Sequence, residues 1–281
     1  MALISTGQLV SAAQARQGAA LAFNVIGLEH AEAIVAGAEA AGEAVILQVS
    51  ENTITYHGGL AGIGSAMVGL ARQSWIDIAV HLDHATSPGL VFEAIGLGFG
   101  SVMFDAAALS YADNVANTVA VAAEAQAQGV WVEAELGEIG GKDGNHEVGV
   151  GTDPAEAAAY VAATGVDGLA VAVGTSHAMV STGATLDFEL IARLREAVPV
   201  PLVLHGASGV SEPDMLIAAA HGIAKINVAT RLNVAFSAAL RRALAERPEA
   251  VDPRAYLGAG RAAVRDEVAG LLTRLASRAT T

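Results

Sequence analysis

Residues 76–83 read IDIAVHLD, an apolar run that ends in a histidine and an aspartate and continues directly into His84. A short run of apolar, largely β-branched residues predicts a strand that is buried on both faces. Ionisable groups are costly to bury unless they have partners. The polar end of this strand therefore indicates a site to which other parts of the chain contribute.

Seven further runs of this kind recur along the chain, separated by alanine-rich segments. The eight predicted strands cover residues 20–25, 43–50, 76–83, 100–106, 129–137, 166–174, 200–206 and 222–228. Helices are predicted at 29–42, 111–129 and 152–165, each of which has apolar residues at helical spacing and ends in glycine. Apolar strands that alternate with helices are typical of a parallel sheet covered on both sides.

The length of the chain distinguishes between the possible parallel architectures. The chain has 281 residues, and a (β/α)8 barrel typically has about 250. Eight strand–helix units fit one such barrel better than an open sheet, and no proline- or serine-rich linker divides the sequence. We therefore predict an α/β fold in which residues 1–281 form a single TIM barrel.

The composition excludes several classes of partner. The net charge of −14 argues against nucleic acid, and no basic patch or long apolar segment indicates a membrane. Because the sequence contains no cysteine, neither disulfides nor thiolate metal ligands can form. The first residues lack the basic start and apolar core of a secretion signal. We expect a soluble, cytoplasmic protein.

Polar residues gather at the carboxyl ends of the predicted strands. They are Asn24, Ser50, Asp83, His84, Asp105, Glu133, Glu135, His205 and Asn227, and His177 follows the sixth strand. In TIM barrels this rim carries the catalytic groups. Three imidazoles from separate strands, with one coordination position left open, are typical of a catalytic zinc site. We therefore predict that His84, His177 and His205 bind a metal ion.

Other titratable residues near this rim have several interpretations. Asp105 and Glu135 are placed to orient the histidine rings, to hold a second cation or to act as alternate ligands. His81 alternates with Asp83 along its strand and is interpreted as a buried group rather than a ligand. The remaining histidines lie in helices or loops, where no ligand role is expected: His30, His57, His146 and His221.

The loops after the seventh and eighth predicted strands contain small residues. They read HGASGV, residues 205–210, and NVATRL, residues 227–232. Small residues allow backbone N–H groups to approach an anion, and a helix that begins there directs its positive end toward it. Because these loops form the usual phosphate site of TIM barrels, we predict that they bind a phosphate group.

These motifs together resemble the class II, metal-dependent ketose-bisphosphate aldolases, the family of the fructose- and tagatose-bisphosphate aldolases. The matching stretches are HLDHA (81–85), SVMFDAA (101–107), VEAELGEIGG (132–141), AVAVGTSHA (170–178), LVLHGASGV (202–210), KINVAT (225–230) and DPRAYL (252–257). They follow the family's order and span most of the chain. The resemblance implies a zinc-dependent lyase of carbohydrate metabolism, such as glycolysis, that forms a homodimer or homotetramer. It would cleave a ketose 1,6-bisphosphate to dihydroxyacetone phosphate and glyceraldehyde 3-phosphate.

The resemblance also implies roles for individual residues. By motif position, the zinc ligands are His84, His177 and His205, and the aspartate that serves the aldehyde oxygen is Asp83. Asp105 and Glu135 match carboxylates that hold a second divalent or a monovalent cation or act as alternate ligands. The substrate contacts fall on Gly206, Ser208, Asn227 and Thr230, and we add Asn24, Ser50 and Arg231 as candidates.

The implied chemistry fits these residue types. Cleavage of the C3–C4 bond requires removal of the C4 hydroxyl proton and an electron sink at C2. Zinc supplies this sink by stabilising an enediolate, and Asp83 is placed to take the proton. Family members then protonate the enediolate with an acid on the mobile loop that corresponds to residues 140–151. Asp143 stands where relatives carry glutamate, and Glu147 is the alternative.

Some departures from the family pattern leave the identity of the sugar substrate undetermined. Ala229 stands where fructose-specific relatives often have aspartate, and the NVAT stretch is similar to tagatose-bisphosphate members. Arg231 stands where those relatives carry an acid, and it would either contact the distal phosphate or another anion, or lie in solvent. Some relatives carry an arginine directly after the stretch that corresponds to Tyr256 and Leu257. This chain lacks it, and Arg254 or Arg261 would have to replace it. Another phosphorylated ketose or a sugar acid therefore remains an alternative substrate.

Three other functions compete with this interpretation. A Schiff-base aldolase would use Lys142 or Lys225, the only lysines in the sequence, but would leave the histidines without a role. A metal-dependent hydrolase would activate water with zinc and an aspartate, but the phosphate loops are better explained by aldol chemistry. A non-enzymatic partner subunit is disfavoured because all three histidines and Asp83 are present.

Overall fold

The computed structural model describes residues 3–136, 151–175 and 183–278. Eight parallel strands form a closed barrel in the order of the sequence, and the last strand pairs with the first. The strands are β1 (Ala20–Asn24), β2 (Val45–Ser50), β3 (Ile78–Ala85), β4 (Ser101–Phe104), β5 (Trp131–Glu135), β6 (Gly168–Ala170), β7 (Leu202–Leu204) and β8 (Ile223–Val228). Each lies in or overlaps a predicted run, so the predicted TIM barrel is confirmed.

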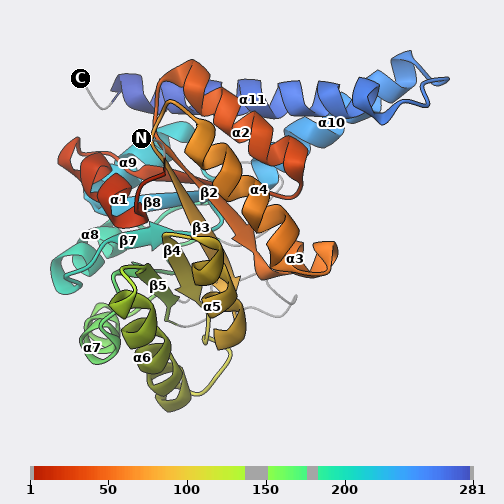
Figure 1. Ribbon diagram of the computed structural model, residues 1–281. Helices are drawn as coiled ribbons and strands as arrows, with labels where there is room; N and C mark the ends of the chain where they lie inside the picture. The colour runs from red at the N-terminus through yellow and green to blue at the C-terminus, as the bar shows by residue number, and fades with distance from the viewer. Residues whose placement is uncertain (1–2, 137–150, 176–182, 279–281) are drawn as a thin grey trace.

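Helices that follow the strands lie around the outside of the barrel, and the last two continue beyond β8 (Figure 1). They are α2 (Leu28–Ala41), α3 (Glu51–His57), α4 (Leu60–Gln73), α5 (Pro88–Leu97), α6 (Tyr111–Ala127), α7 (Pro154–Thr164), α8 (Phe188–Ala197), the 3-10 helix η1 (Ala207–Gly209), α9 (Glu212–His221), α10 (Thr230–Glu246) and α11 (Pro253–Arg278). The three helices predicted from the sequence correspond to α2, α6 and α7. Capping explains the bounds of α7, because the Asp153 carboxylate accepts hydrogen bonds from the N–H groups of Ala155 and Glu156, and Gly165 ends the helix at φ 66°.

Helix α1 (Thr6–Ala15) precedes the barrel and was not predicted from the sequence. It begins with a capping box, in which the Ser5 hydroxyl accepts from the N–H of Gln8 and the Gln8 side chain accepts from the N–H of Ser5. Its apolar side chains join a second core cluster made of small interior residues at the start of the strands. The cluster consists of Leu9, Val10 and Ala13 of α1 and of Ala20, Ala22, Ile46, Ala79 and Ala224 of the strands. The amino-terminal end of the barrel is therefore packed with apolar groups.

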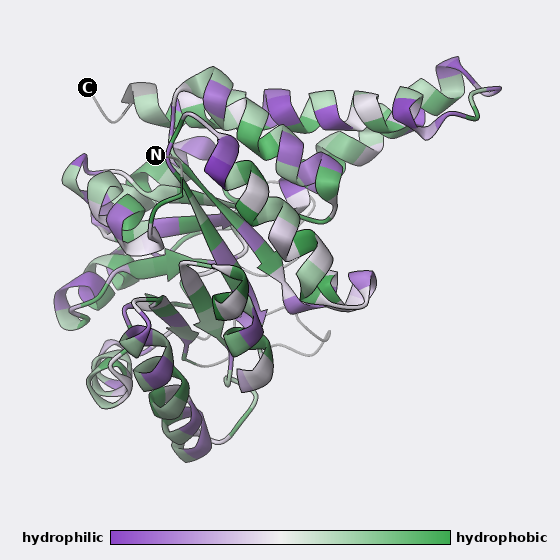
Figure 2. Cartoon of the chain, viewed as in Figure 1, coloured by the Kyte–Doolittle hydropathy of each residue, from purple (hydrophilic) through white to green (hydrophobic). Residues whose placement is uncertain are grey.

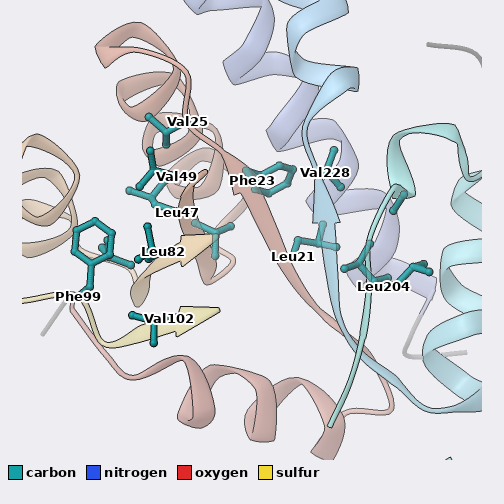
Figure 3. Close-up of a cluster of buried hydrophobic side chains, with 14 of the residues drawn as sticks. Leu21, Phe23, Val25, Leu47, Val49, Leu82, Phe99, Val102, Leu204 and Val228 are labelled. Atoms are coloured by element: carbon teal, nitrogen blue, oxygen red, sulfur yellow. The ribbon is translucent and has the colours of Figure 1, made fainter. Parts of the chain in front are cut away.

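The main core lies between the outside of the barrel and the helices. Figure 3 shows part of it, including Leu21, Phe23, Val25, Leu47, Val49, Leu82, Phe99, Val102, Leu204 and Val228. The strands are largely hydrophobic along their length, whereas hydrophilic and hydrophobic residues alternate along the helices (Figure 2). Because successive side chains of a strand point to opposite faces, the residues between these apolar ones face the barrel interior.

The last two helices form an arm that extends beyond the barrel (Figure 1). Its second helix, α11, returns along α2, and the two helices approach closely at Gly37. A Cβ atom at this position would lie 2.6 Å from the carbonyl oxygen of Arg265, so that only glycine fits. In the part of the chain that the structure describes, no helix is both long and apolar enough to span a membrane.

Candidate active site and metal centre

The site is formed by inward-facing residues near the carboxyl ends of the strands. On β3, His81 and Asp83 face the barrel interior, whereas Leu82 packs in the outer core. On β5, Glu133 and Glu135 alternate in the same way. All four of these side chains are buried. Their position follows from the two-residue period of a strand.

His84 breaks this period and nevertheless faces the site. Its backbone has a φ of 52°, and the pairing of β3 with β4 shifts register between Leu82 and Ala85. The left-handed region is uncommon for a residue other than glycine and tends to occur at functional sites. Ligand atoms of Asp83, His84 and His205 all lie within 4.8 Å of one another.

Each of the two histidines contacts a carboxylate through Nδ1. His84 Nδ1 lies 2.8 Å from Asp105 Oδ2, and His205 Nδ1 lies 3.1 Å from Glu135 Oε2. The two imidazole rings meet edge to face, with their centroids 4.7 Å apart. The structure therefore places Asp105 and Glu135, the two carboxylates singled out in the sequence, directly against predicted metal ligands.

His205 makes a second contact below the rim. Its Nε2 atom lies 3.0 Å from Glu133 Oε1, and the other oxygen of Glu133 accepts a 2.9 Å hydrogen bond from Lys225 Nζ. Burial alone would lower the pKa of His205, but the hydrogen bonds with Glu133 and Glu135 raise it to about 9. Burial would raise the pKa of Glu133, but Lys225 holds it well below its usual range. Glu133, which the sequence predicts at the rim, instead pairs with Lys225 inside the barrel.

Three side-chain amides surround the carboxylate of Asp83. Asn24 Nδ2 donates to its Oδ2 at 3.1 Å, and Asn227 Nδ2 donates to its Oδ1 at 3.4 Å. Gln48 Nε2 donates to Asn24 Oδ1 at 2.7 Å and reaches Asp83 Oδ2 at 3.4 Å. Burial alone would raise the pKa of Asp83, but the charges of His84 and His205 outweigh it and hold the pKa at about 2. Asp83 is thus an oriented, ionised carboxylate.

Gln48 was missed in the sequence, although the pattern contained a signal for it. It is a polar residue within the apolar run 43–50, and it occupies an inward position two residues before Ser50. Its Oε1 atom and the Oδ1 atom of Asn227 are buried and have no hydrogen-bond partner among the described residues. Because such acceptors are costly to leave unpaired, they are available to a ligand that carries hydroxyl groups.

The predicted phosphate loops lie against each other. Gly206 has a φ of 68° and leads into η1. Ser208 in η1 accepts hydrogen bonds from the backbone N–H groups of Ala229 and Arg231, each at 3.2 Å. These groups belong to the first turn of α10, where Thr230 begins the helix and Ala229 supplies no side-chain cap. A helix N-terminus beside a small-residue loop can bind an anion, because the positive end of the helix points toward it.

Two of the proposed substrate contacts have structural partners of their own. Ser50 caps α3 by accepting a hydrogen bond from the N–H of Thr53 at 3.4 Å. The Arg231 guanidinium is bound by Glu212, at 2.7 Å, and by Glu267. The sequence predicts that this arginine contacts an anionic substrate or lies in solvent. The structure instead shows an ion-pair cluster that joins α9, α10 and α11.

The two arginines considered as replacements for the missing family arginine also pair with acids. Arg254 binds the neighbouring Asp252 at 2.6 Å, and its side chain is 90% exposed. Arg261 binds Glu32 of α2 at 2.5 Å. These contacts therefore give no support to a substrate role for either arginine.

Other candidates lie outside the described residues or away from the cluster. His177, Lys142, Asp143, His146 and Glu147 fall in the stretches that the structure does not describe. His30, His57 and His221 lie in α2, α3 and α9. His81 is fully buried, and its Nδ1 atom lies 2.8 Å from the Ser101 hydroxyl.

Comparisons with known proteins identify the family of the chain. Residues 4–280 match the model of the family described as fructose-bisphosphate aldolase class-II. The YdjI aldolase from Escherichia coli K12 is similar at 31% identity over 98% of both chains, with a TM-score of 0.85. A candidate fructose-1,6-biphosphate aldolase from Coccidioides immitis is 28% identical over 98% of both chains, with a TM-score of 0.82. Fructose-bisphosphate aldolase from Campylobacter jejuni shares the fold, with a TM-score of 0.80 at 22% identity over 98% of this chain and 95% of that one.

Proposed function

The chain belongs to the class II fructose-bisphosphate aldolase family, and on this premise we propose that it is a zinc-dependent lyase that cleaves a phosphorylated ketose. The observation that carries the proposal is the cluster of Asp83, His84 and His205, whose ligand atoms lie within 4.8 Å of one another. We further propose that residues 1–281 form one aldolase domain. Family resemblance supports a homodimer or homotetramer, and the acidic, cysteine-free composition suits the cytoplasm.

The donor set fits zinc, which binds imidazole nitrogens and carboxylate oxygens. His84 and His205 would hold the ion together with His177, which is proposed from its motif position alone. Asp105 contacts Nδ1 of His84, as the second partner of a metal-binding imidazole usually does, which favours an orienting role for Asp105 over a second divalent or a monovalent cation. Glu135 lies against Nδ1 of His205, and we propose it as an alternate ligand. When bound, zinc would supply a Lewis acid that polarises the ketose carbonyl.

Asp83 is proposed as the group that removes the C4 hydroxyl proton in cleavage and returns it in the synthetic direction. Its carboxylate is ionised and therefore able to accept a proton. The amides of Asn24 and Asn227 orient it from two sides. Gln48 Oε1 and Asn227 Oδ1 have no hydrogen-bond partner among the described residues, which supports a role in accepting hydrogen bonds from substrate hydroxyl groups. Protonation of the carbon is proposed for Asp143, with Glu147 as the alternative.

The phosphate shared with dihydroxyacetone phosphate is proposed to bind at Gly206, Ser208 and Thr230. The first-turn N–H groups of α10 and the small residues of η1 support this position. Asn24, Ser50 and Asn227 remain candidate contacts for the sugar. Arg231 is not included among the proposed substrate contacts, because its guanidinium is bound by Glu212 and Glu267.

The structure also bears on the rival Schiff-base mechanism. That mechanism needs a neutral lysine amine that can reach the substrate carbonyl. Lys225 instead donates to Glu133 at 2.9 Å, and both side chains are fully buried. A buried ammonium group that is paired with a carboxylate is a poor nucleophile. Borohydride treatment in the presence of substrate should therefore leave no covalent adduct on Lys225.

A coupled assay for triose phosphates tests the proposal. Fructose 1,6-bisphosphate, tagatose 1,6-bisphosphate, other phosphorylated ketoses and sugar acids should be compared, before and after removal of metal with a chelator. We expect dihydroxyacetone phosphate to be released from at least one ketose, lost with the metal and restored by Zn²⁺. Undiminished cleavage by the metal-free protein would contradict the proposal. Release of inorganic phosphate without triose phosphate would indicate the hydrolase instead.

A further inference from the structure

Below the proposed zinc site, buried polar groups form a string inside the barrel. Lys225 of β8 binds one oxygen of Glu133 at 2.9 Å, and the other oxygen contacts His205 Nε2 at 3.0 Å. The side chains of Lys225 and Glu133 are fully buried, and that of His205 is 1% exposed. The proposed mechanism uses neither Glu133 nor Lys225.

Fold stability alone does not account for this ion pair. Transferring two charges into a protein interior carries a desolvation penalty that their attraction often fails to offset, and apolar residues of similar volume are commonly as good. The next interior layer of this barrel is in fact built from apolar residues such as Ala22, Ile46 and Ala79. The pair therefore points to a role beyond packing.

The contacts of His205 suggest what that role is. An ionised carboxylate can only accept hydrogen bonds, so the contact with Glu133 requires a hydrogen on Nε2. Which nitrogen of a histidine binds a metal is set by the hydrogen bond that the other nitrogen makes. Nδ1 contacts Glu135 at 3.1 Å on the side of the rim, and a metal ion that bound there would take the place of the hydrogen between Nδ1 and Glu135.

Lys225 is the group that holds Glu133 in this position. His81 is the other polar neighbour, but its Nε2 atom lies 3.9 Å from Glu133 Oε2, too far for a hydrogen bond. The Nδ1 atom of His81 contacts Ser101 instead. The orientation of the carboxylate is therefore determined by Lys225 on one oxygen and by His205 on the other.

We infer that Glu133, anchored by Lys225, is a positioning residue that keeps the hydrogen on Nε2 of His205 and presents Nδ1 to the zinc ion. This inference rests on the proposed function, because it assumes that His205 is a zinc ligand. It assigns a role in metal binding to two residues that do not themselves contact the metal or the substrate.

Two variants and one control test the inference. Glu133→Gln keeps the shape of the side chain but offers an amide that can donate to Nε2. The double variant Glu133→Gln/Lys225→Met removes both charges, so that no unpaired charge is left buried. Thr6→Val is the matched control, because it removes a buried hydroxyl from the far end of the same interior, where Thr6 contacts Ser101 and not His205. Zinc affinity is measured by competition with a chromophoric chelator, and folding by circular dichroism and Tm.

We expect both Glu133 variants to bind zinc roughly 10- to 100-fold more weakly than the wild type, and the control to bind it equally well. The double variant should keep a Tm close to that of the wild type, so that loss of affinity is separated from loss of stability. The visible spectrum of the Co²⁺-substituted protein should change in the Glu133 variants and not in Thr6→Val. Unchanged affinity and spectrum in a folded double variant would overturn the inference.

A second test of the inference uses the wild-type protein alone and therefore does not depend on whether the variants fold. Nitrogen-15 NMR of the zinc-loaded protein should show His205 with hydrogen on Nε2 and metal on Nδ1, and the opposite tautomer would overturn the inference. The coupled aldolase assay of the wild type tests the proposed function separately. A protein that binds zinc through Nδ1 of His205 but cleaves no ketose would contradict only the proposed function.

Discussion

Asp83 and His84 are neighbours in the sequence, yet both direct ligand atoms into one cluster with His205. Regular alternation along a strand would send the two side chains to opposite faces of the barrel. The left-handed backbone of His84, at φ 52°, and the register shift between Leu82 and Ala85 turn the second side chain inward. The candidate metal site thus depends on a local distortion of β3 as well as on the identity of its residues.

This distortion predicts an unusual order of stability among substitutions of His84. Both His84→Gly and His84→Ala remove the imidazole and its contact with Asp105, but only glycine adopts a positive φ without steric cost. We expect the glycine variant to be more stable than the alanine variant by about 1 kcal/mol, as measured by denaturant unfolding of the metal-free proteins. At ordinary helical or strand positions, alanine is the more stable of the two. An alanine variant that is equally stable or more stable would show that the backbone of His84 is not strained.

The barrel itself was predictable because its strands carry a strong local signal. A parallel strand that is buried on both faces consists of nearly continuous apolar residues, and eight such runs, most of them ending in polar residues, define the rim. The weaker signal of α1 was missed, because this helix is stabilised by packing against the ends of several strands. Its local marker is the capping box formed by Ser5 and Gln8.

Partners that are distant in the sequence could not be predicted from it. Lys225 and Glu133 are separated by 92 positions, and neither residue has a local pattern that identifies the other. Arg231 likewise finds Glu212 and Glu267 on two other helices, so that a residue predicted to face substrate is held in an ion-pair cluster. The roles of His177 and Asp143 remain predictions from motif position.

Substitution of Asp83 by asparagine tests its role as the proton acceptor. The change Asp83→Asn preserves the volume of the side chain but replaces the ionised carboxylate with a neutral amide, which cannot take up the proton. We expect turnover in the coupled assay to fall by roughly 10²- to 10⁴-fold, with zinc content unchanged by metal analysis. Full turnover would remove Asp83 from the mechanism. Loss of zinc would instead identify Asp83 as a metal ligand.

The ion-pair cluster around Glu212 predicts a pH dependence of stability. Hydrogen bonds with Arg274 and Arg231 outweigh burial and lower the pKa of Glu212 from 4.5 to about 2. Because the pKa is lower in the folded state, the contribution to stability is complete above pH 4.5 and is lost as the pH falls toward 2. We expect Glu212→Gln to lower the Tm at about pH 6, and the difference from the wild type to shrink as the pH is lowered to about 3.

The exposed pair of Asp252 and Arg254 provides the control for this experiment. Arg254 is 90% exposed, and exposed ion pairs contribute little to stability. Asp252→Asn keeps an oxygen that can accept from the N–H of Arg254 and should leave the Tm nearly unchanged at both pH values. A Glu212→Gln variant that behaves like this control would show that the cluster does not stabilise the junction of the three helices.

Two serines near the phosphate loops allow substrate binding to be separated from helix capping. Ser208 holds the first turn of α10 through the N–H groups of Ala229 and Arg231, and we propose that it contacts the substrate phosphate. Ser211 caps α9 by accepting from the N–H of Asp214 at 3.2 Å. Ser208→Ala should raise the KM for the ketose phosphate about tenfold, as expected for the loss of one hydrogen bond worth about 1.4 kcal/mol, without changing zinc affinity.

Ser211→Ala should instead reduce stability by about 1 kcal/mol, the usual cost of losing a helix cap, and leave KM unchanged. Steady-state kinetics and denaturant unfolding of both variants distinguish the two roles. If Ser208→Ala loses stability but keeps the wild-type KM, Ser208 acts only as a cap for α10, and the phosphate must bind elsewhere on the rim. A raised KM that accompanies unaltered unfolding would place the anion at the junction of η1 and α10, because there the Ser208 hydroxyl meets two backbone N–H groups of a helix start.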